Sequence, residues 1–331
     1  MSDKFETPSM GYAGFCALLN GFFPGSPSYT EKDYPKLDGK VVIVTGASAG
    51  LGYEVTKSLL GSTNAKVYMF TRNKQKTIDA IKRLETEVAK EFNKTNLNVD
   101  YISIDFADLT TIKPAAEEFL SKSDRLDIII HNAGVMLPPE GSVTKQGFEL
   151  QLGTNNFGPH LFQKFLDPLI IKTSIKNKPG VSRIVWVSSF GHYMSSLGGI
   201  FYPDPNFTTT KVGKGNIYGQ SKAINILQAK GWNTIHPDGN NVTCVSLCPG
   251  FLRTELQRYG SSFELFMSDL LFKKARYGAY TQLYAALSPE IYTGAHVQAF
   301  GKLTTSRPDL TEPSYISKAW KFLDEHVESY L

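Results

Sequence analysis

The chain has 331 residues, of which 41% are hydrophobic and 20% are charged, and these values are ordinary for a globular protein with a full hydrophobic core. They exclude a disordered or collagen-like chain. The formal charge of +4 is small and the Lys and Arg residues are scattered, which excludes the concentrated basic surface of a nucleic-acid-binding protein.

An amino-terminal arm, residues 1–38, precedes the first predicted strand. Its apolar run at residues 10–23 is shorter than the roughly 18 residues that a membrane span requires, and no basic segment precedes it as in a secretory signal. We expect the arm to pack on the domain, to lie loose, or to touch a membrane or lipid-droplet surface. The three cysteines are too few for a disulfide framework and lack zinc-site spacing, so the sequence indicates a cytoplasmic location and no metal site.

Residues 39–331 alternate short β-branched apolar runs with longer amphipathic stretches, a pattern that is typical of parallel βαβ units. Strands are expected near 41–44, 67–70, 99–104, 126–130, 184–187, 242–247 and 297–300. Helices are expected near 50–60, 74–92, 112–120, 158–172 and 218–235. The sequence therefore predicts an α/β fold of the Rossmann type: one doubly wound domain with a seven-stranded parallel sheet and helices on both faces.

A glycine-rich turn, TGASAGLG at residues 45–52, follows the first predicted strand directly and leads into a helix. Gly46, Gly50 and Gly52 let the backbone approach a pyrophosphate, and the helix that follows points unpaired amides at the anion. A glycine-rich turn alone is often only a tight connection, but its position between a strand and a helix favours nucleotide binding.

The second predicted strand ends at Arg72, where NAD-binding proteins of this type place an acid that holds the ribose hydroxyls. Arg72 can instead pair with a 2′-phosphate, assisted by Ser48, Lys74 or Lys76, and this favours NADP(H) as the cofactor. The alternative is a solvated Arg at the start of a charged helix. Asp105, after the third strand, is expected to accept a hydrogen bond from the adenine amino group or to cap a helix before Leu109.

Tyr218 and Lys222 are spaced so that a phenol and an ammonium group lie one helical turn apart. A nearby cation makes the phenolate accessible near neutral pH, so Tyr218 is a candidate general acid/base and Lys222 its activating cation. In isolation such a pair is more often a surface helix contact.

Two further segments reach the same predicted edge of the sheet. The fifth strand ends in Ser188-Ser189, and Ser189 is the expected holder of a carbonyl oxygen, with Ser188 as the alternative and an ordinary strand-end hydrogen bond as the simpler reading. After the fourth strand, Asn132, Ala133 and Gly134 supply small residues against which a cofactor can lie.

Two intervals, about 190–216 and 255–276, are too long for ordinary connections, and we expect them to shape a substrate pocket. Ordinary surface insertions are the alternative. The aromatic residues in and near these intervals suggest a hydrophobic substrate, although the same residue types also build cores: Phe190, Tyr193, Phe201, Tyr202, Phe263 and Phe266.

Taken together, these motifs resemble the classical short-chain dehydrogenases/reductases over about residues 40–300. The quoted segments TGASAGLG, HNAG, GTNNFGPH, VSS, YGQSK and CPG occur in the order and approximate spacing of that family. Three further segments, TEKDYPKLDGK, LQLGTNNFGPHLF and CPGFLRTEL, are similar to the retinol-dehydrogenase-like branch and to fungal NADPH-dependent carbonyl reductases.

The resemblance implies a catalytic tetrad of Asn155, Ser189, Tyr218 and Lys222, with Asn155 supporting a water that links Lys222 to solvent. It also implies cofactor contacts beyond those read from the residues alone, namely Leu51, Asn132, Tyr218, Lys222, Pro249, Gly250 and Thr254. His131 stands where the family usually has Asn, a change that we expect to affect one local hydrogen bond. Because the family often assembles through helix pairs, a homodimer is one assembly that it allows.

The sequence therefore predicts an NADP(H)-dependent oxidoreductase that interconverts a small-molecule carbonyl compound and its alcohol, with no nucleic-acid partner. A non-enzymatic NADP(H) sensor on the same fold is the main alternative, although sensors typically lose the tetrad. An epimerase or dehydratase that acts on nucleotide sugars is a second alternative, but its turn normally has the spacing Gly-x-x-Gly-x-x-Gly.

Overall fold

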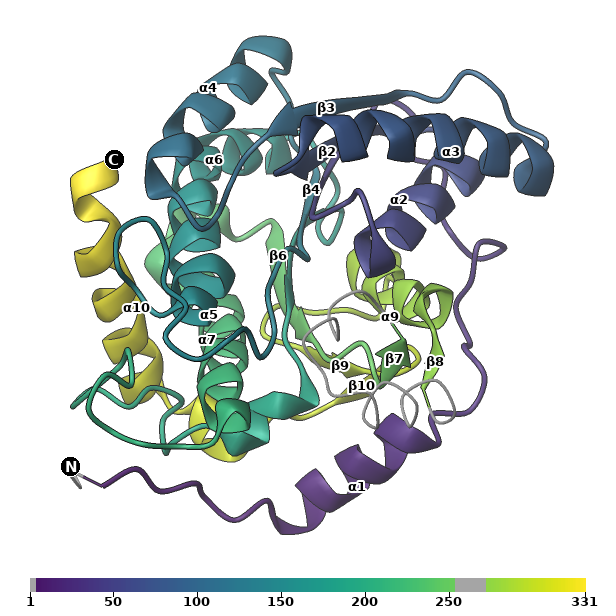
Figure 1. Ribbon diagram of the computed structural model, residues 1–331. Coiled ribbons are helices and arrows are strands. Elements are labelled where there is room, and N and C mark those ends of the chain that lie inside the picture. The colour runs from purple at the N-terminus through teal and green to yellow at the C-terminus, as the bar shows by residue number, and fades with distance from the viewer. Residues whose placement is uncertain (1–3, 254–271) are drawn as a thin grey trace.

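An eight-stranded sheet lies at the centre of the computed structural model, which describes residues 4–253 and 272–331 (Figure 1). Its strands are β1 (Val41–Thr45), β2 (Lys66–Thr71), β3 (Val99–Ser103), β4 (Ile128–His131), β5 (Ser182–Val187), β6 (Val242–Leu247), β9 (His296–Gln298) and β10 (Lys302–Thr304). They are ordered β10-β9-β6-β5-β4-β1-β2-β3, and all neighbours are parallel except the antiparallel pair β9–β10. A separate two-stranded sheet joins β7 (Leu252–Arg253) and β8 (Lys273–Lys274).

The predicted Rossmann-type α/β class is confirmed, but the predicted strand count of seven is wrong. The eighth strand, β10, follows a turn at Gly301, whose φ is +82°, and runs back along β9. Lys302 and Leu303 are exposed, so this three-residue strand has no apolar run for a sequence pattern to detect.

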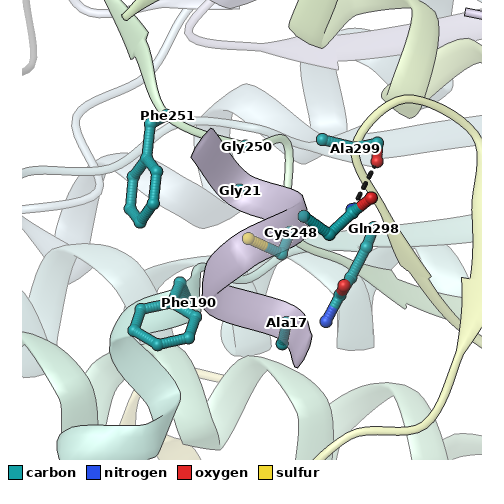
Figure 2. Close-up of a pocket in the computed structure, with 9 residues that line it drawn as sticks. Ala17, Gly21, Phe190, Cys248, Gly250, Phe251, Gln298 and Ala299 are labelled. Atoms are coloured by element: carbon teal, nitrogen blue, oxygen red, sulfur yellow. Dashed lines mark hydrogen bonds between the residues drawn. The ribbon is translucent and has the colours of Figure 1, made fainter. Parts of the chain in front are cut away.

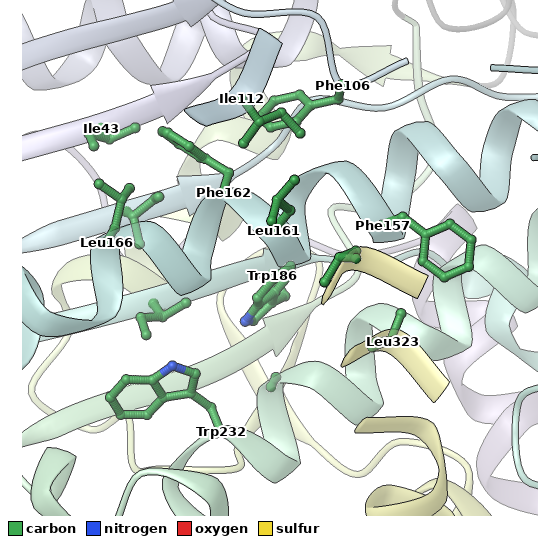
Figure 3. Packing of buried hydrophobic residues seen from close by; sticks show 14 of the residues in the cluster. Ile43, Phe106, Ile112, Phe157, Leu161, Phe162, Leu166, Trp186, Trp232 and Leu323 are labelled. Carbon is green, nitrogen blue, oxygen red and sulfur yellow. The ribbon is translucent and has the colours of Figure 1, made fainter. Parts of the chain in front are cut away.

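The central strands are continuous runs of apolar residues because helices cover both faces of the sheet. Val42 and Val44 point into one hydrophobic cluster, whereas Val41 and Ile43 point into the cluster on the opposite face. A parallel sheet buried on both sides has this composition. Figure 3 shows part of the second cluster, where Trp186 of β5 lies among side chains of the helices.

Helices cover the two faces in separate groups. On one face lie α2 (Gly50–Ser62), α3 (Lys74–Phe92) and α9 (Ala275–Leu287); on the other lie α4 (Ile112–Lys122), α6 (Gly158–Ser174), α7 (Lys214–Ile235) and α10 (Pro313–Val327). The short helix α5 (Leu150–Leu152) and a π-helical turn, η2 (Gly153–Phe157), lead into α6. A 3-10 helix, η3 (Phe190–Met194), follows β5.

Helix α10 packs on α7 and was not predicted. Trp320 is buried and its indole N–H donates to the carbonyl of Leu227 at 3.1 Å. Asp324 accepts hydrogen bonds from His160 at 2.9 Å and from Lys164 at 2.7 Å, both on α6. The homodimer that the resemblance allows stays a prediction.

Within the arm, helix α1 (Gly11–Phe22) packs on the domain, which was one of the expected arrangements. The side-chain amide of Asn20 donates to the carbonyl of Ala299 at 2.6 Å, and Lys302 Nζ donates to Asn20 Oδ1 at 2.7 Å. Within residues 4–253 and 272–331, no helix is long and apolar enough to cross a membrane. Contact of the arm with a lipid surface and a cytoplasmic location stay predictions.

The predicted helix 74–92 agrees with α3, whereas α7 begins four residues earlier than expected, at Lys214. Tyr218 therefore lies in the second turn of α7, where the helix is buried, and not at its frayed end. In the predicted interval 255–276, residues up to 271 lie outside the described part of the chain.

Candidate active site

Tyr218 and Lys222 lie one turn apart on the buried side of α7. The ammonium nitrogen of Lys222 is 5.7 Å from the centre of the Tyr218 ring. It donates to the carbonyl of Val187 at 2.9 Å, at the carboxyl end of β5, and more weakly to Asn225 Oδ1 at 3.4 Å. The predicted proximity of the Tyr218 phenol and the Lys222 ammonium is therefore present.

Burial shifts the pKa of both groups toward their neutral forms. Burial raises the pKa of the Tyr218 phenol above its ordinary range, while a hydrogen bond with the Ser189 side chain opposes the rise. Burial lowers the pKa of Lys222 to about 8. Burial of the phenol therefore opposes access to the phenolate near neutral pH, and the activating role of Lys222 stays a prediction. Tyr218 holds its proton, as a general acid requires.

The structure separates the two serines at the end of β5. Ser188 is buried and its hydroxyl donates to the carbonyl of Lys222 at 2.6 Å, which is the role of a packing contact between β5 and α7. Ser189 is the N-cap of η3, accepts a hydrogen bond from the amide of Gly191 at 3.1 Å, and also hydrogen-bonds Tyr218. Of the two, only Ser189 shares a hydrogen bond with the phenol.

Asn155 lies in the π-helical turn η2, a local widening that is frequent at functional sites. Its side chain forms a two-way pair with Val135, accepting from the backbone amide at 2.8 Å and donating to the carbonyl at 3.0 Å. Its carbonyl accepts a hydrogen bond from Asn225 Nδ2 at 3.1 Å, and Asn225 in turn contacts Lys222. Sequence reasoning missed Asn225, although its position three residues after Lys222 places it on the same face of α7.

The glycine-rich turn is closed around the loop that follows β4. The hydroxyl of Thr45 accepts hydrogen bonds from the amides of Asn132 at 3.0 Å and Ala133 at 2.9 Å, and Asn132 Nδ2 donates to the Thr45 carbonyl at 2.9 Å. Gly46 and Gly50 have φ of +67° and +55°. This cradle of backbone groups at the start of α2 fits the pyrophosphate of a dinucleotide.

Gly52 is the tightest position in this cradle. A Cβ there would lie 2.5 Å from the carbonyl oxygen of Gly46 and 2.6 Å from Asn132 Nδ2. We expect Gly52→Ala to push the turn open, lowering NADPH affinity at least roughly 10-fold and destabilising the fold by about 1–3 kcal/mol. Isothermal titration and urea denaturation measure the two effects; unchanged affinity in a folded variant would contradict the proposed role of the turn.

The other predicted cofactor residues lie around this cradle. Arg72 is exposed at the end of β2, and Ser48 and Leu51 are half-buried in the turn and the first turn of α2. Asp105 Oδ1 accepts from the amide of Ala107 at 3.0 Å, whereas Asp108 caps the short helix that begins at Leu109, so the expected capping alternative for Asp105 is wrong.

Gly134 and the loop after β6 contain the remaining predicted cofactor residues. A Cβ on Gly134 would lie 3.0 Å from Asn155 Oδ1 and 3.6 Å from Lys222 Nζ, so this glycine borders the candidate catalytic residues. Pro249 and Gly250 are half-buried directly after β6. Thr254 lies outside the described residues.

His131, the departure from the family pattern, points into the core. Its ring stacks on Trp186 with centroids 4.1 Å apart, and its Nε2 pairs with Gln163 Oε1 at 2.8 Å. Burial lowers its pKa to about 4, so the ring is neutral. The adjacent Asn132 keeps its contacts with the turn, and the effect of His131 on a local hydrogen bond stays a prediction.

A hollow of about 10 Å³, enough for no more than a water, lies between α1, the start of η3 and the loop after β6 (Figure 2). Among its lining residues are Phe190 and Phe251, and the latter was missed because it falls outside both predicted intervals. Tyr193 packs against Phe190, whereas Phe201 and Tyr202 pack elsewhere, against Phe207 and Phe322 respectively. Phe263 and Phe266 lie outside the described residues.

Comparison with known proteins places the chain in a family. A family model described as short chain dehydrogenase matches residues 40–204. The chain is 38% identical to the short-chain dehydrogenase/reductase pkfC of Emericella nidulans over 311 residues, which covers 92% of this chain and 98% of that protein. The chain therefore belongs to the short-chain dehydrogenase/reductase family of oxidoreductases, as its motifs predicted.

Solved structures agree on the fold. A protein from Mycobacterium paratuberculosis superposes with a TM-score of 0.65 at 22% identity, covering 91% of this chain and 97% of that one. An NADPH-bound carbonyl reductase from chicken fatty liver superposes with a TM-score of 0.60 at 21% identity, covering 81% of this chain and 99% of that one. The narrower resemblance to the retinol-dehydrogenase-like branch stays a prediction.

Proposed function

We propose that this protein is an NADP(H)-dependent carbonyl reductase that converts a hydrophobic ketone or aldehyde into its alcohol and runs the reverse oxidation. The observation that carries the proposal is the arrangement around Tyr218: a buried, protonated phenol that hydrogen-bonds Ser189 and lies beside the ammonium of Lys222. This group is next to a backbone cradle that suits a dinucleotide.

In the proposed reaction, Ser189 binds the carbonyl oxygen of the substrate and Tyr218 donates the phenolic proton to it. A bound nicotinamide supplies the hydride that adds to the carbonyl carbon. Lys222 then stabilises the phenolate that remains, because an ammonium a few ångströms away favours the charged form. In the oxidation direction the phenolate takes the proton back from the alcohol.

Asn155 and Asn225 hold Lys222 in place for this role. The hydrogen bonds from Lys222 to Asn225 and from Asn225 to the Asn155 carbonyl connect the ammonium to the π-helical turn. We propose that this connection orients the ammonium toward the phenol. The hydrogen bond from Lys222 Nζ to the Val187 carbonyl holds the ammonium as well.

The first test is a direct assay. Purified full-length protein is mixed with NADPH or NADH and a panel of bulky and small ketones, and the absorbance of the reduced nicotinamide is followed. The proposal predicts faster oxidation of NADPH than of NADH and a preference for apolar ketones. Binding of NADPH without turnover of any ketone or alcohol would contradict it and favour the sensor alternative.

Arg72 is the proposed determinant of NADP(H) preference. Replacing Arg72 by Glu removes a cation that pairs with the 2′-phosphate and adds a repelling charge, so we expect the KM for NADPH to rise roughly 10–100-fold while that for NADH stays within about 2-fold. Lys82→Glu, the same charge change on an exposed position of α3, is the matched control. Equal responses of the two variants would assign NADPH binding to other residues.

A further inference from the structure

Arg307 is a buried cation that lies outside the motifs identified in the sequence. It stands between β10 and the 3-10 helix η6 (Pro308–Thr311), and only 2% of its surface is exposed. Its guanidinium pairs with Asp309 in two places: Nε donates to Oδ1 at 2.6 Å and Nη2 donates to Oδ2 at 2.9 Å. Asp309 Oδ2 also accepts from the backbone amide of Gly198 at 2.7 Å. The carboxylate compensates the buried charge and leaves the other N–H groups for further partners.

These other N–H groups all reach one short stretch of backbone, the end of η3. Nη1 donates to the carbonyls of His192 at 3.2 Å, Tyr193 at 3.4 Å and Ser195 at 3.0 Å. Nη2 donates to the carbonyl of Ser196 at 2.6 Å. The last carbonyls of a helix lack N–H partners from a following turn. One guanidinium therefore caps the carboxyl end of η3.

The opposite end of η3 carries Ser189. His192, whose carbonyl Arg307 holds, donates twice to the carbonyl of Ser189: from its backbone amide at 3.1 Å and from its ring Nδ1 at 2.7 Å. Ser189 is the N-cap of η3, and its hydroxyl hydrogen-bonds Tyr218. The guanidinium is thus connected to this hydroxyl through a single turn of helix.

Helix η3 packs on α7 with the two backbones in contact. A Cβ on Gly219 of α7 would lie 2.6 Å from the carbonyl oxygen of Gly191, and a Cβ on Gly191 would lie 3.0 Å from the Tyr218 ring. Because no side chain separates the two elements at this point, a shift of η3 along α7 moves Ser189 relative to Tyr218.

We propose that Arg307 is a positioning residue for carbonyl reduction: it fixes η3 on α7 and so keeps the Ser189 hydroxyl in contact with the Tyr218 phenol. The reaction itself rests on the proposed function. Lysine does not replace Arg307, because a compact ammonium with three N–H groups cannot serve the carboxylate and the helix end together. Misplacing a group of the reacting assembly by about 1 Å costs roughly 100-fold in rate.

Kinetics of single and double variants test the positioning role. Arg307→Lys is expected to lower kcat for ketone reduction at least roughly 10-fold. In a Ser189→Ala background the same substitution should change kcat by less than about 2-fold, because no hydroxyl remains to be positioned. The fall in Tm caused by Arg307→Lys should be the same in both backgrounds. Equal fractional losses of kcat in the two backgrounds would overturn the proposal.

Arg183→Lys is the matched control. Arg183 is also buried and donates to the carbonyls of Gly180 at 2.7 Å, Ala285 at 2.9 Å and Ser288 at 2.6 Å. It lies near the start of β5, whereas η3 follows the end of that strand. This substitution should lower Tm and leave kcat within about 2-fold. A loss of kcat as large as that of Arg307→Lys would mean that reduced stability alone slows the reaction, which would also overturn the proposal.

Hydrogen exchange tests the hold on η3 without any substrate. The amides of His192 and Ser195 donate within this segment, and mass spectrometry of peptides follows their exchange in D₂O. We expect residues 190–196 to exchange at least roughly 10-fold faster in Arg307→Lys and at the wild-type rate in Arg183→Lys. Unchanged exchange in the Arg307 variant would show that Arg307 does not hold η3. If no ketone is turned over but exchange rises in that variant alone, the proposed function fails while the hold of Arg307 on η3 stands.

Discussion

Replacing Tyr218 by Phe is expected to lower kcat for ketone reduction by roughly 10²–10⁴-fold, the usual contribution of a positioned general acid. The ring and its packing stay, and only the hydroxyl that hydrogen-bonds Ser189 is lost. Burial keeps this phenol protonated, so the reductive direction should persist to high pH before the acid form is lost. Stopped-flow measurement of NADPH oxidation gives the rate, and fluorescence titration of NADPH separates the loss of rate from any change in cofactor affinity.

Tyr202→Phe is the matched control, because the Tyr202 hydroxyl is also buried and has no hydrogen-bond partner among residues 4–253 and 272–331. It should leave kcat within about 2-fold. A Tyr218→Phe variant that keeps more than one tenth of wild-type kcat would show that another group donates the proton.

Replacing Lys222 by Met is expected to lower kcat by at least roughly 100-fold and, at pH 7, to stabilise the protein. The catalytic loss follows because the phenolate that forms at Tyr218 loses its neighbouring cation. The stabilisation follows from burial, which lowers the pKa of Lys222 from its ordinary value of 10.5 to about 8. Below pH 8 the folded protein therefore holds a charged ammonium in a desolvated site, which costs roughly 1–3 kcal/mol.

The contribution of Lys222 to the free energy of unfolding depends on pH. Between pH 8 and 10.5 the unfolded chain binds the Lys222 proton and the folded chain does not, so the contribution of Lys222 to the free energy of unfolding rises with pH across that window. Urea denaturation at pH 7 and pH 10 should show a stability gain for the Met variant that shrinks at the higher pH. A variant less stable than wild type at pH 7 would mean that the lost hydrogen bond to Val187 outweighs desolvation.

Features that depend on residues close together in the sequence were predicted correctly. Buried parallel strands require apolar runs, and a backbone cradle requires glycines, so β1 and the turn that follows it were identified from the residues alone. The spacing of Tyr218 and Lys222 likewise follows from helix geometry, and the structure places them together. Their chemical roles still rest on the experiments proposed above.

Features that depend on contacts between distant residues were not predicted. The placement of α1 is decided by Asn20 and Ala299, 279 positions apart, and nothing in the arm's own sequence encodes that partner. The contact between Phe22 of α1 and Phe251 likewise joins distant parts of the chain. The burial that raises the pKa of Tyr218 was not predicted, because the depth of burial is a property of the whole fold.

The position of α10 also has a consequence for how the protein tolerates cleavage. Its buried residues Ala319, Trp320, Leu323 and Val327 belong to the same hydrophobic cluster as α7. A chain cut before Pro313 therefore leaves one side of α7 without a cover and exposes that apolar surface to water. We expect chaperones and proteases to act on molecules cut at this point, because exposed apolar surface is what they recognise.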